Sequence, residues 1–305
     1  MSLQVEVNDP TNFAMRDSSR FALEAEAIGF AGVGMPDHPH TGTDVFVRLA
    51  AAAHVTEQIM LFPSVANPVT RNAETLATLA RSLDEVAPGR TRLILGGGDN
   101  AVKFAGKQPA TVAELIDAVR LIKSDLAGTG IKVFMNASSP RMLNAAGVAA
   151  DGVYAMVGVA PEVIAAALEY VAEGAQSVGR NPQDVDVAIG LPVFVATSPE
   201  RADETALPYA FSNLIRRTRV FSRVMRANYP VYDSAVHQSD LSPRDARKLT
   251  EAMVVSGSPI EVAERTKALS RALGQSHFIA RVEFEGREPI AAMKAFGAQL
   301  MGACQ

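Results

Sequence analysis

The sequence predicts a fold of the α/β class, a (β/α)8 TIM barrel, and three observations lead to that prediction. Eight stretches with the composition of β-strands alternate, nearly throughout, with stretches of helical periodicity, which is typical of parallel βα units with right-handed crossovers. A length of 305 residues is normal for such a barrel. Polar residues and glycines also gather directly after the predicted strands. A doubly wound open sheet is the alternative, but no GxGxxG motif follows the first strand.

The predicted strands are short runs of β-branched or small apolar residues. Turn-forming residues follow them, such as Asn8-Asp9-Pro10 after the first strand and Gly96-Gly97-Gly98 after the fourth. In chain order the strands are expected at residues 3–7, 31–35, 59–63, 91–95, 132–136, 152–157, 185–195 and 277–283.

The predicted helices fill the intervals between the strands. Residues 111–126 form the clearest amphipathic helix, and several others begin with a serine N-cap followed by proline. The helices are expected at residues 11–28, 44–55, 72–86, 111–126, 140–150 and 289–301, and at starts from residues 161, 201, 243 and 259. Because residues 201–256 exceed one βα unit, we expect a helical insertion there, after the seventh strand. It is helical to residue 228, irregular over 229–241, and part of a single domain spanning 1–305.

Composition excludes several classes of protein. The chain is 48% hydrophobic, so it is globular, and its formal net charge of −4 argues against a nucleic-acid-binding surface. One cysteine, Cys304, allows neither an internal disulfide nor a cysteine metal cage. The amino terminus does not have the pattern of a signal peptide, and no apolar run is long enough to cross a bilayer. We therefore expect a cytoplasmic protein without a membrane or nucleic-acid partner.

The main indication of an enzyme is the set of polar groups that follow the strands, because active sites of barrels lie at the carboxyl ends of the strands. These groups lie at residues 6–8, 37–38, 64–67, 96–99, 136–139, 158 and 197–198. They match neither a zinc motif nor a GxSxG nucleophile elbow, so no metal site is expected. His38 and the serines that follow the predicted strands leave a Ser-His-Asp hydrolase as an open alternative, although no motif supports it.

Three of these groups have both a functional and a structural interpretation. The glycines at 96–98 let a flat group approach the backbone, or they form a flexible turn. Ser138 and Ser139, at a helix start, receive a phosphate, or Ser139 is an ordinary N-cap. His38 is a general acid or a hydrogen-bond donor to a ring, or it is a surface-loop histidine.

Five segments in order resemble the bacterial-luciferase-like flavin and deazaflavin oxidoreductases. The resemblance is greatest to the branch that contains the coenzyme-F420-dependent methylenetetrahydromethanopterin reductases. The segments are AEAIGFAGVGMPDH (25–38), PSVANPVTRNAETLATLARSLDEVAPGRTRLILGGGDN (63–100), NASSPRMLNAAGVAADGV (136–153), EGAQSVGRNPQDVDV (173–187) and SGSPIEVAERTKAL (256–269). Each alone is a weak signal, but together they span nearly the whole chain. The resemblance implies a (β/α)8 barrel, usually a homodimer.

The resemblance also implies roles for individual residues. The family's acid–histidine pair beside the cofactor ring falls on Asp37 and His38, and a bulge behind the ring, often with a non-proline cis peptide, falls on Ser64 and Val65. The other implied cofactor-binding residues are Asn67, Gly97, Gly98, Ala137, Ser138 and Ser139, of which the last three form the phosphate-side loop. The implied catalytic residues are His38, Glu6 and Asp99, where Glu6 matches a substrate-facing acid near the end of the first strand.

By this resemblance the protein transfers a hydride between coenzyme F420, a deazaflavin, and a small organic substrate, with a methylenetetrahydromethanopterin-like compound as a candidate. The Gly-Asp-Asn turn at 98–100 and the stretch GKQPATVAEL (106–115) favour F420 over FMN. One alternative is an FMN-dependent two-component monooxygenase. The other is a non-catalytic barrel that lost its cofactor. This non-catalytic alternative stays open because residues 128–130 lead almost directly into the strand that begins at Lys132. Many members of the family carry a long excursion at this place that helps cover the substrate.

Overall fold

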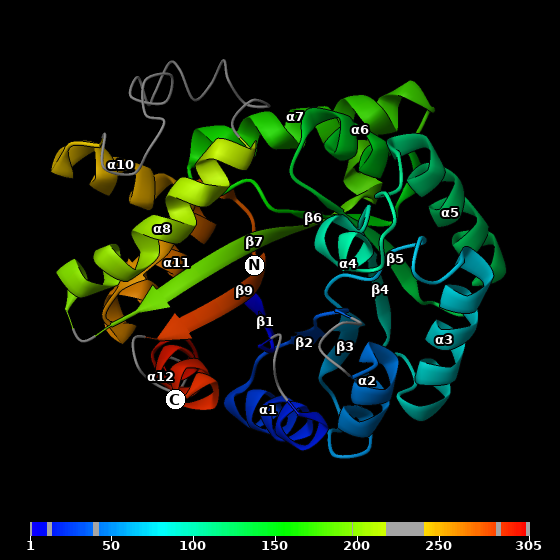
Figure 1. Ribbon diagram of the computed structural model, residues 1–305, viewed down its shortest axis with the longest axis horizontal. Coiled ribbons are helices and arrows are strands. Elements are labelled where there is room, and N and C mark those ends of the chain that lie inside the picture. Colours follow the sequence, from blue (N-terminus) through cyan, green and yellow to red (C-terminus); the bar gives the residue numbers. More distant parts are fainter. Residues whose placement is uncertain are drawn as a thin grey trace.

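A computed structural model describes residues 2–10, 14–38, 43–196, 198–217, 241–284 and 288–302, without the side chains of residues 99, 100, 199, 200, 213–217 and 284. Its strands gather at the centre of the molecule and most helices surround them (Figure 1). The strands are β1 (Gln4–Asn8), β2 (Gly32–Met35), β3 (Met60–Pro63), β4 (Arg92–Leu95), β5 (Lys132–Ala137), β6 (Gly152–Ala155), β7 (Asp186–Val195), β8 (Val255–Gly257) and β9 (His277–Phe284).

The strands form a parallel barrel in the order β3-β2-β1-β9-β7-β6-β5-β4. Bridges between Leu61 and Thr91 and between Ala66 and Leu95 join β3 to β4 and nearly close the ring. These eight strands correspond to the eight predicted ones, so the predicted barrel is confirmed. β8 was not predicted. It pairs only with the outer end of β7, at residues 193–195, and takes no place in the ring.

The helices follow the predicted alternation. They are α1 (Met15–Ile28), α2 (Val45–Ala53), α3 (Ala73–Val86), α4 (Asp99–Phe104), α5 (Val112–Asp125), α6 (Pro140–Ala149), α7 (Pro161–Ser177), α8 (Pro199–Arg217), α10 (Pro243–Met253), α11 (Pro259–Leu273) and α12 (Pro289–Met301), with a short 3-10 turn η2 (Pro182–Asp184). The sequence did not predict α4, which lies inside the ring of helices, over the barrel (Figure 1). In the segment 201–256 the described elements are α8, α10 and β8, and residues 218–240 lie outside the described part of the chain.

The Ser-Pro helix starts are where the sequence places them. The hydroxyl oxygens of Ser139, Ser242 and Ser258 each accept a hydrogen bond from a backbone N–H of the first turn, with proline at the next position. Ser258 also forms a capping box with Glu261. Such caps satisfy donors that the helix itself leaves unpaired, so they set the helix starts locally.

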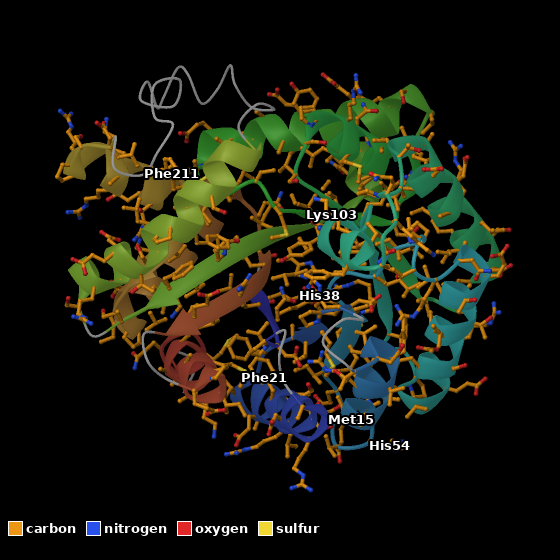
Figure 2. All side chains as sticks on the ribbon, in the orientation of Figure 1. Met15, Phe21, His38, His54, Lys103 and Phe211 are labelled. Carbon is orange, nitrogen blue, oxygen red and sulfur yellow. The ribbon has the colours of Figure 1, made fainter. Side chains whose placement is uncertain are left out.

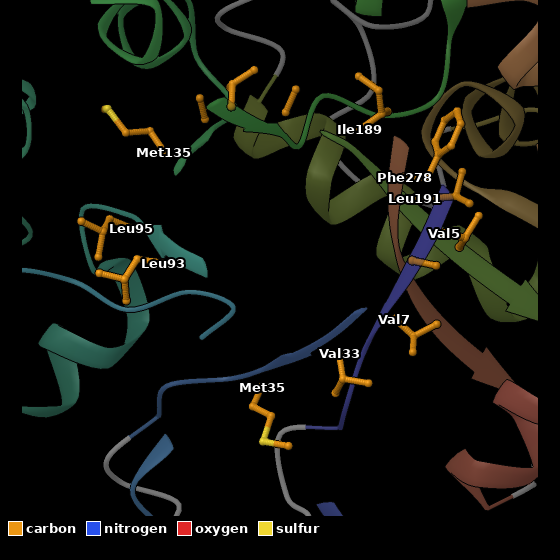
Figure 3. Packing of buried hydrophobic residues seen from close by; sticks show 14 of the residues in the cluster. Val5, Val7, Val33, Met35, Leu93, Leu95, Met135, Ile189, Leu191 and Phe278 are labelled. Atoms are coloured by element: carbon orange, nitrogen blue, oxygen red, sulfur yellow. The ribbon is translucent and has the colours of Figure 1, made fainter. Parts of the chain in front are cut away.

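Alternation along the strands separates two cores. Val5 and Val7 of β1 face the helices and belong to the larger core, part of which is drawn in Figure 3. Between them, Glu6 faces the barrel interior, which is filled by Phe62, Ile94, Phe134, Tyr154, Ala188 and Ile279. This apolar interior layer separates the two ends of the barrel. Of the helices that the structure describes, none combines the length and apolar character needed to span a membrane.

Candidate active site

The carboxyl-terminal ends of the barrel strands bring most of the predicted site residues together. The chain leaves the barrel at this end after each of β2, β3, β4 and β5. The residues that follow these strands include His38, residues 64–67, residues 96–98 and residues 138–139. Figure 2 shows His38 near the centre of the view, over the strands. The rim is therefore built from segments that lie far apart in the sequence.

The loop after β3 lies against the end of β4. The Ala66 N–H donates to the Ile94 carbonyl at 3.0 Å, and the Gly96 N–H donates to the Ala66 carbonyl at 2.9 Å. The peptide bond between Ser64 and Val65 is cis, as the family resemblance led us to expect. The side-chain oxygen of the buried Asn67 accepts from the Val69 and Thr70 N–H groups, which holds the loop in a turn.

The glycines after β4 are required by this contact. A Cβ on Gly96 would lie 3.0 Å from a methyl carbon of Val65, and one on Gly98 would lie 2.9 Å from Cγ of Asn67. Gly98 also has φ +86°, which side chains rarely adopt. The Ala110 N–H donates to the Gly97 carbonyl at 2.9 Å and closes the excursion that contains α4. Gly96, Gly97 and Gly98 thus form a tightly packed segment, here called the glycine wall. Asp99 begins α4, and its side chain lies outside what the structure describes.

Three asparagine side chains at this end each keep one buried polar atom without a hydrogen-bond partner among the described residues. These atoms are Asn8 Oδ1, Asn67 Nδ2 and Asn136 Oδ1. The set contains two acceptors and one donor, beside the half-buried apolar side chains of Val65 and Met156. Because unpaired buried polar groups are costly, the arrangement suits a flat ligand with an apolar face and an edge that both donates and accepts. The imide edge of a flavin or deazaflavin ring has this chemistry, so the residues present fit such a group.

Asp37 ties the loop after β2 to the loop after β3. Its carboxylate is buried and lies 2.5 Å from Nη1 of Arg71, whose Nη2 contacts Asp44 at 2.6 Å. Asp44 also caps α2 by accepting from the Phe46 N–H. Burial raises the pKa of Asp37, and Arg71 offsets that rise only in part. Burial also raises the pKa of Asp44, but the bonds from Arg71 outweigh it and leave the pKa lowered. Asp37 therefore has a structural partner that holds the segment before His38.

The loop after β5 combines both interpretations of its serines. Ala137 is the last residue of β5 and is buried, whereas Ser138 and Ser139 are half-buried. Ser139 is the N-cap of α6, where its hydroxyl oxygen accepts from the Met142 N–H at 3.3 Å. The amino terminus of α6 thus lies at the rim beside Ser138, where a helix favours anions. The N-cap is confirmed, and phosphate binding stays a prediction.

Glu6 is not brought to this rim. Its fully buried carboxylate pairs with Nη2 of Arg92 and lies 3.2 Å from Nε2 of His277, which are the first residues of β4 and β9. Burial raises its pKa, but Arg92 and His277 outweigh that effect and hold the pKa below its usual value. Two basic side chains thus hold the carboxylate inside the barrel, away from the rim. We therefore leave Glu6 out of the proposed reaction site.

The loop after β1 is anchored by another buried ion pair. Arg48 of α2 donates through Nη2 to both carboxylate oxygens of Asp9, at 2.8 and 2.6 Å, and also to the hydroxyl of Ser18 in α1. Arg48 and Asp9 have fully buried side chains. Burial raises the pKa of Asp9 from 3.8 to about 6, because the loss of solvation outweighs the attraction of Arg48.

This raised pKa predicts a pH-dependent stability. A carboxyl whose pKa is higher in the folded than in the unfolded chain stabilises most below its unfolded value of 3.8, and that contribution is lost as the pH rises through 6. Compared with Asp9→Asn, the unchanged protein should gain about 1 kcal/mol of unfolding free energy when the pH falls from 7 to 5. Urea unfolding at both pH values measures this. Asp17→Asn, at an exposed position of α1, is the control and should show no such gain. An Asp9→Asn difference independent of pH would contradict the prediction.

The family of the chain follows from a match over most of its length. Residues 2–276 match the family described as luciferase-like monooxygenase. The chain belongs to this luciferase-like family. Its rim, with the cis peptide after β3, the glycine wall after β4 and the capped helix after β5, is therefore the place where the family resemblance and the geometry agree.

Two relatives of this luciferase-like protein are enzymes with named activities. A 5,10-methylenetetrahydromethanopterin reductase of Methanolobus tindarius is 32% identical, over 56% of this chain and 59% of the relative. The aligned part is therefore about three fifths of that relative's length. An F420-dependent glucose-6-phosphate dehydrogenase of Kribbella flavida is 28% identical, over 63% of this chain and 69% of the relative.

Solved structures show the same fold across the luciferase-like barrel. The coenzyme-F420-dependent tetrahydromethanopterin reductase of Methanopyrus kandleri superimposes with a TM-score of 0.77 at 19% identity, with both chains covered completely. The oxygenating constituent of 3,6-diketocamphane monooxygenase from Pseudomonas putida, in complex with FMN, gives a TM-score of 0.69 at 16% identity, over 99% of this chain and 96% of the other. At these identities the likeness concerns the fold.

Sequence reasoning missed one residue that the geometry brings to the site, Arg71. Asn8 and Asn136 belong to the polar groups predicted at the strand ends, residues 6–8 and 136–139, although the family resemblance gave them no role. Arg71 gave no signal, because its partners Asp37 and Asp44 are distant in sequence and nothing local indicates the pairing. The described residues contain no group of three or more His, Cys, Asp or Glu side chains able to hold a metal ion.

Proposed function

We propose that this protein is an oxidoreductase that transfers a hydride between coenzyme F420 and a small organic substrate. The observation that supports the proposal most is the rim itself. Three asparagine atoms there lack hydrogen-bond partners among the described residues, and two of these side chains, Asn67 and Asn136, lie against Gly98 and Gly96. The F420-dependent glucose-6-phosphate dehydrogenase of Kribbella flavida supports the choice of cofactor.

The residues of the rim have distinct roles in this proposal. The backbone at Ser64 and Val65 and at Gly97 and Gly98 packs on the ring, with Asn67 beside it. A deazaflavin supplies two-electron hydride chemistry when bound, and the protein supplies binding, orientation and electrostatics. The ring's imide edge has one N–H and two carbonyl oxygens, so it can accept from Asn67 Nδ2 and donate to one of the two unpaired oxygens, Asn8 Oδ1 or Asn136 Oδ1.

Two further groups complete the cofactor site in the proposal. The loop of Ala137, Ser138 and Ser139, at the start of α6, receives the phosphate through N–H groups, hydroxyls and the helix dipole. Asp37 acts through Arg71, because this ion pair holds the two loops in register. Its proposed role is therefore to position neighbouring residues.

His38 is the proposed catalytic residue. It is half-buried and follows the anchored Asp37, so its imidazole is held at the rim. We assign it a hydrogen bond near the reacting end of the ring. Asp99, directly after the glycine wall, is assigned a proton or a cation on the substrate. Candidate substrates are those in the names of the relatives, a methylenetetrahydromethanopterin-like pterin and glucose 6-phosphate.

A second candidate function is that of an FMN-dependent two-component monooxygenase. The family description and the FMN complex of a structural neighbour favour it, and the rim fits a flavin as well as a deazaflavin. A deazaflavin reductase should turn over without O2, whereas the monooxygenase needs O2 and a reductase partner. A non-catalytic barrel relative predicts that neither cofactor binds.

A parallel titration of the purified protein with F420 and with FMN, followed by absorbance and fluorescence, tests the proposal. Saturable binding of F420, at least tenfold tighter than that of FMN, is the expected result. Preference for FMN would favour the monooxygenase, and binding of neither would favour the non-catalytic reading. In a Gly96→Val variant the added side chain would displace Val65, so binding of the cofactor should be lost.

We also propose that the protein acts in the cytoplasm as a homodimer. The single cysteine of the chain fits a reducing compartment, and the family resemblance implies the dimer. Light scattering coupled to gel filtration measures the oligomeric state. A monomeric mass at micromolar concentration would contradict the proposed homodimer.

A further inference from the structure

A cavity lies at the amino-terminal end of the barrel, opposite the rim. Its volume is 1010 Å³, and its lining includes the first residues of β4, β5, β7 and β9. Ligand pockets for small molecules have volumes of roughly 300–1,000 Å³. In this fold that end normally contributes to stability, so a cavity of this size there needs a separate explanation.

Arg92 and Thr91 make the cavity unusual. Both are 5% exposed, and both line it. The Arg92 guanidinium lies 4.2 Å from the ring centroid of Phe62 and 4.8 Å from that of Phe134, and its Nη2 donates to Glu6. Arg92 Nε and Thr91 Oγ1 have no hydrogen-bond partner among the described residues. A buried N–H of a cation and a buried hydroxyl left unpaired are costly, so a polar group in the cavity would stabilise them.

The charges at this end favour an acceptor with a negative charge. Arg92 and His277 both approach Oε2 of Glu6, and that carboxylate is fully buried, whereas Arg92 and His277 line the cavity. One carboxylate oxygen thus serves two basic side chains, while the Nε–H of Arg92 still has no acceptor among the described residues.

The other charged groups of the lining are already engaged. Lys132 and Asp186 pair with each other at 2.5 Å at the mouth of the cavity, and Asp84 accepts from the Gly89 N–H at 3.1 Å. The rest of the lining includes apolar side chains, among them Leu168 and Val171 of α7. A ligand would therefore meet cationic and hydroxyl donors near Arg92 and apolar side chains of α7.

We propose that this cavity is a second binding site, for a small carboxylic acid with an apolar body. The carboxylate accepts from Arg92 Nε and the Thr91 hydroxyl, while the body lies against Leu168 and Val171. The site shares no residue with the rim, and the apolar interior layer separates them. It is therefore independent of the proposed redox function.

Calorimetric titration of the full chain with hexanoate tests this. Hexanoate should bind saturably, and hexanamide, its uncharged analogue, should bind at least tenfold more weakly. Absence of saturable hexanoate binding, or equal binding of the amide, would each overturn the proposal; the first would mean that water fills the cavity.

Variants locate the binding. Thr91→Val keeps the shape of the side chain and removes one donor, so it should weaken hexanoate binding about tenfold. Thr78→Val, on the exposed face of α3, is the matched control and should leave binding unchanged. Because Arg92→Leu leaves Glu6 unpaired in the interior and risks misfolding, Arg92→Lys is the second variant, retaining the charge but losing Nε. Unchanged affinity in both Thr91→Val and Arg92→Lys would place hexanoate elsewhere and overturn the assignment.

Discussion

Replacing His38 with alanine should lower turnover by roughly 10²- to 10⁴-fold, the contribution typical of a positioned acid–base group. The expected cause is loss of the hydrogen bond that we assign to His38 near the reacting end of the cofactor. Folding should change little, because His38 is only half-buried and the ion pair that holds the preceding segment stays in place. Steady-state rates with F420 and the substrate found by screening measure the turnover.

The matched control for this experiment is His54→Ala. His54 is exposed at the end of α2, away from the rim, and both histidines are labelled in Figure 2. Its removal should leave turnover within about twofold. If His38→Ala keeps the rate of the unchanged protein while F420 still binds, His38 has no part in the mechanism.

Replacing Arg71 with methionine should lower the free energy of unfolding at pH 7 by about 3 kcal/mol and weaken cofactor binding as well. The buried carboxylate of Asp37 then loses its partner, Asp44 loses one of its bonds, and the cation–π contact of Arg71 with Phe46 at 5.6 Å disappears. The loops after β2 and β3, which carry the proposed ring contacts, are no longer tied together. Urea unfolding measures the first effect and F420 titration the second.

The pH dependence of this variant is a further check with a defined sign. Burial already raises the pKa of Asp37, and removing Arg71 removes the main opposing effect. A raised folded-state pKa makes the protein more stable as the pH falls, so the loss in Arg71→Met should shrink towards pH 5. Adding Asp37→Asn should restore part of the stability at pH 7. Arg271→Met, exposed on α11, is the control and should cost little; an equal loss there would remove the ion pair as the explanation.

Local signals were enough to predict most of the scaffold. Strand composition, helical periodicity and turn residues lie next to one another in the chain, and the eight predicted strands form the observed ring. The Ser-Pro starts at Ser139, Ser242 and Ser258 were predictable because a cap and its N–H donors are within a few residues. The glycine wall after β4 was visible for the same reason. The sequence did not predict β8 and α4, because both elements are short and tertiary packing rather than their own residues stabilises them.

For the candidate site, too, local signals predicted some features and not others. The positions at the carboxyl ends of the strands follow from the fold class, so His38, Ser64, Gly97, Gly98 and Ser139 could be placed at the rim from the residues alone. Which buried charges pair could not be predicted. Asp37 with Arg71, Asp9 with Arg48, and Glu6 with Arg92 and His277 each join residues from different βα units. Their partners meet only after the barrel closes, because the energy of a buried charge depends on which side chains the fold brings within a few ångströms and on how much water it excludes.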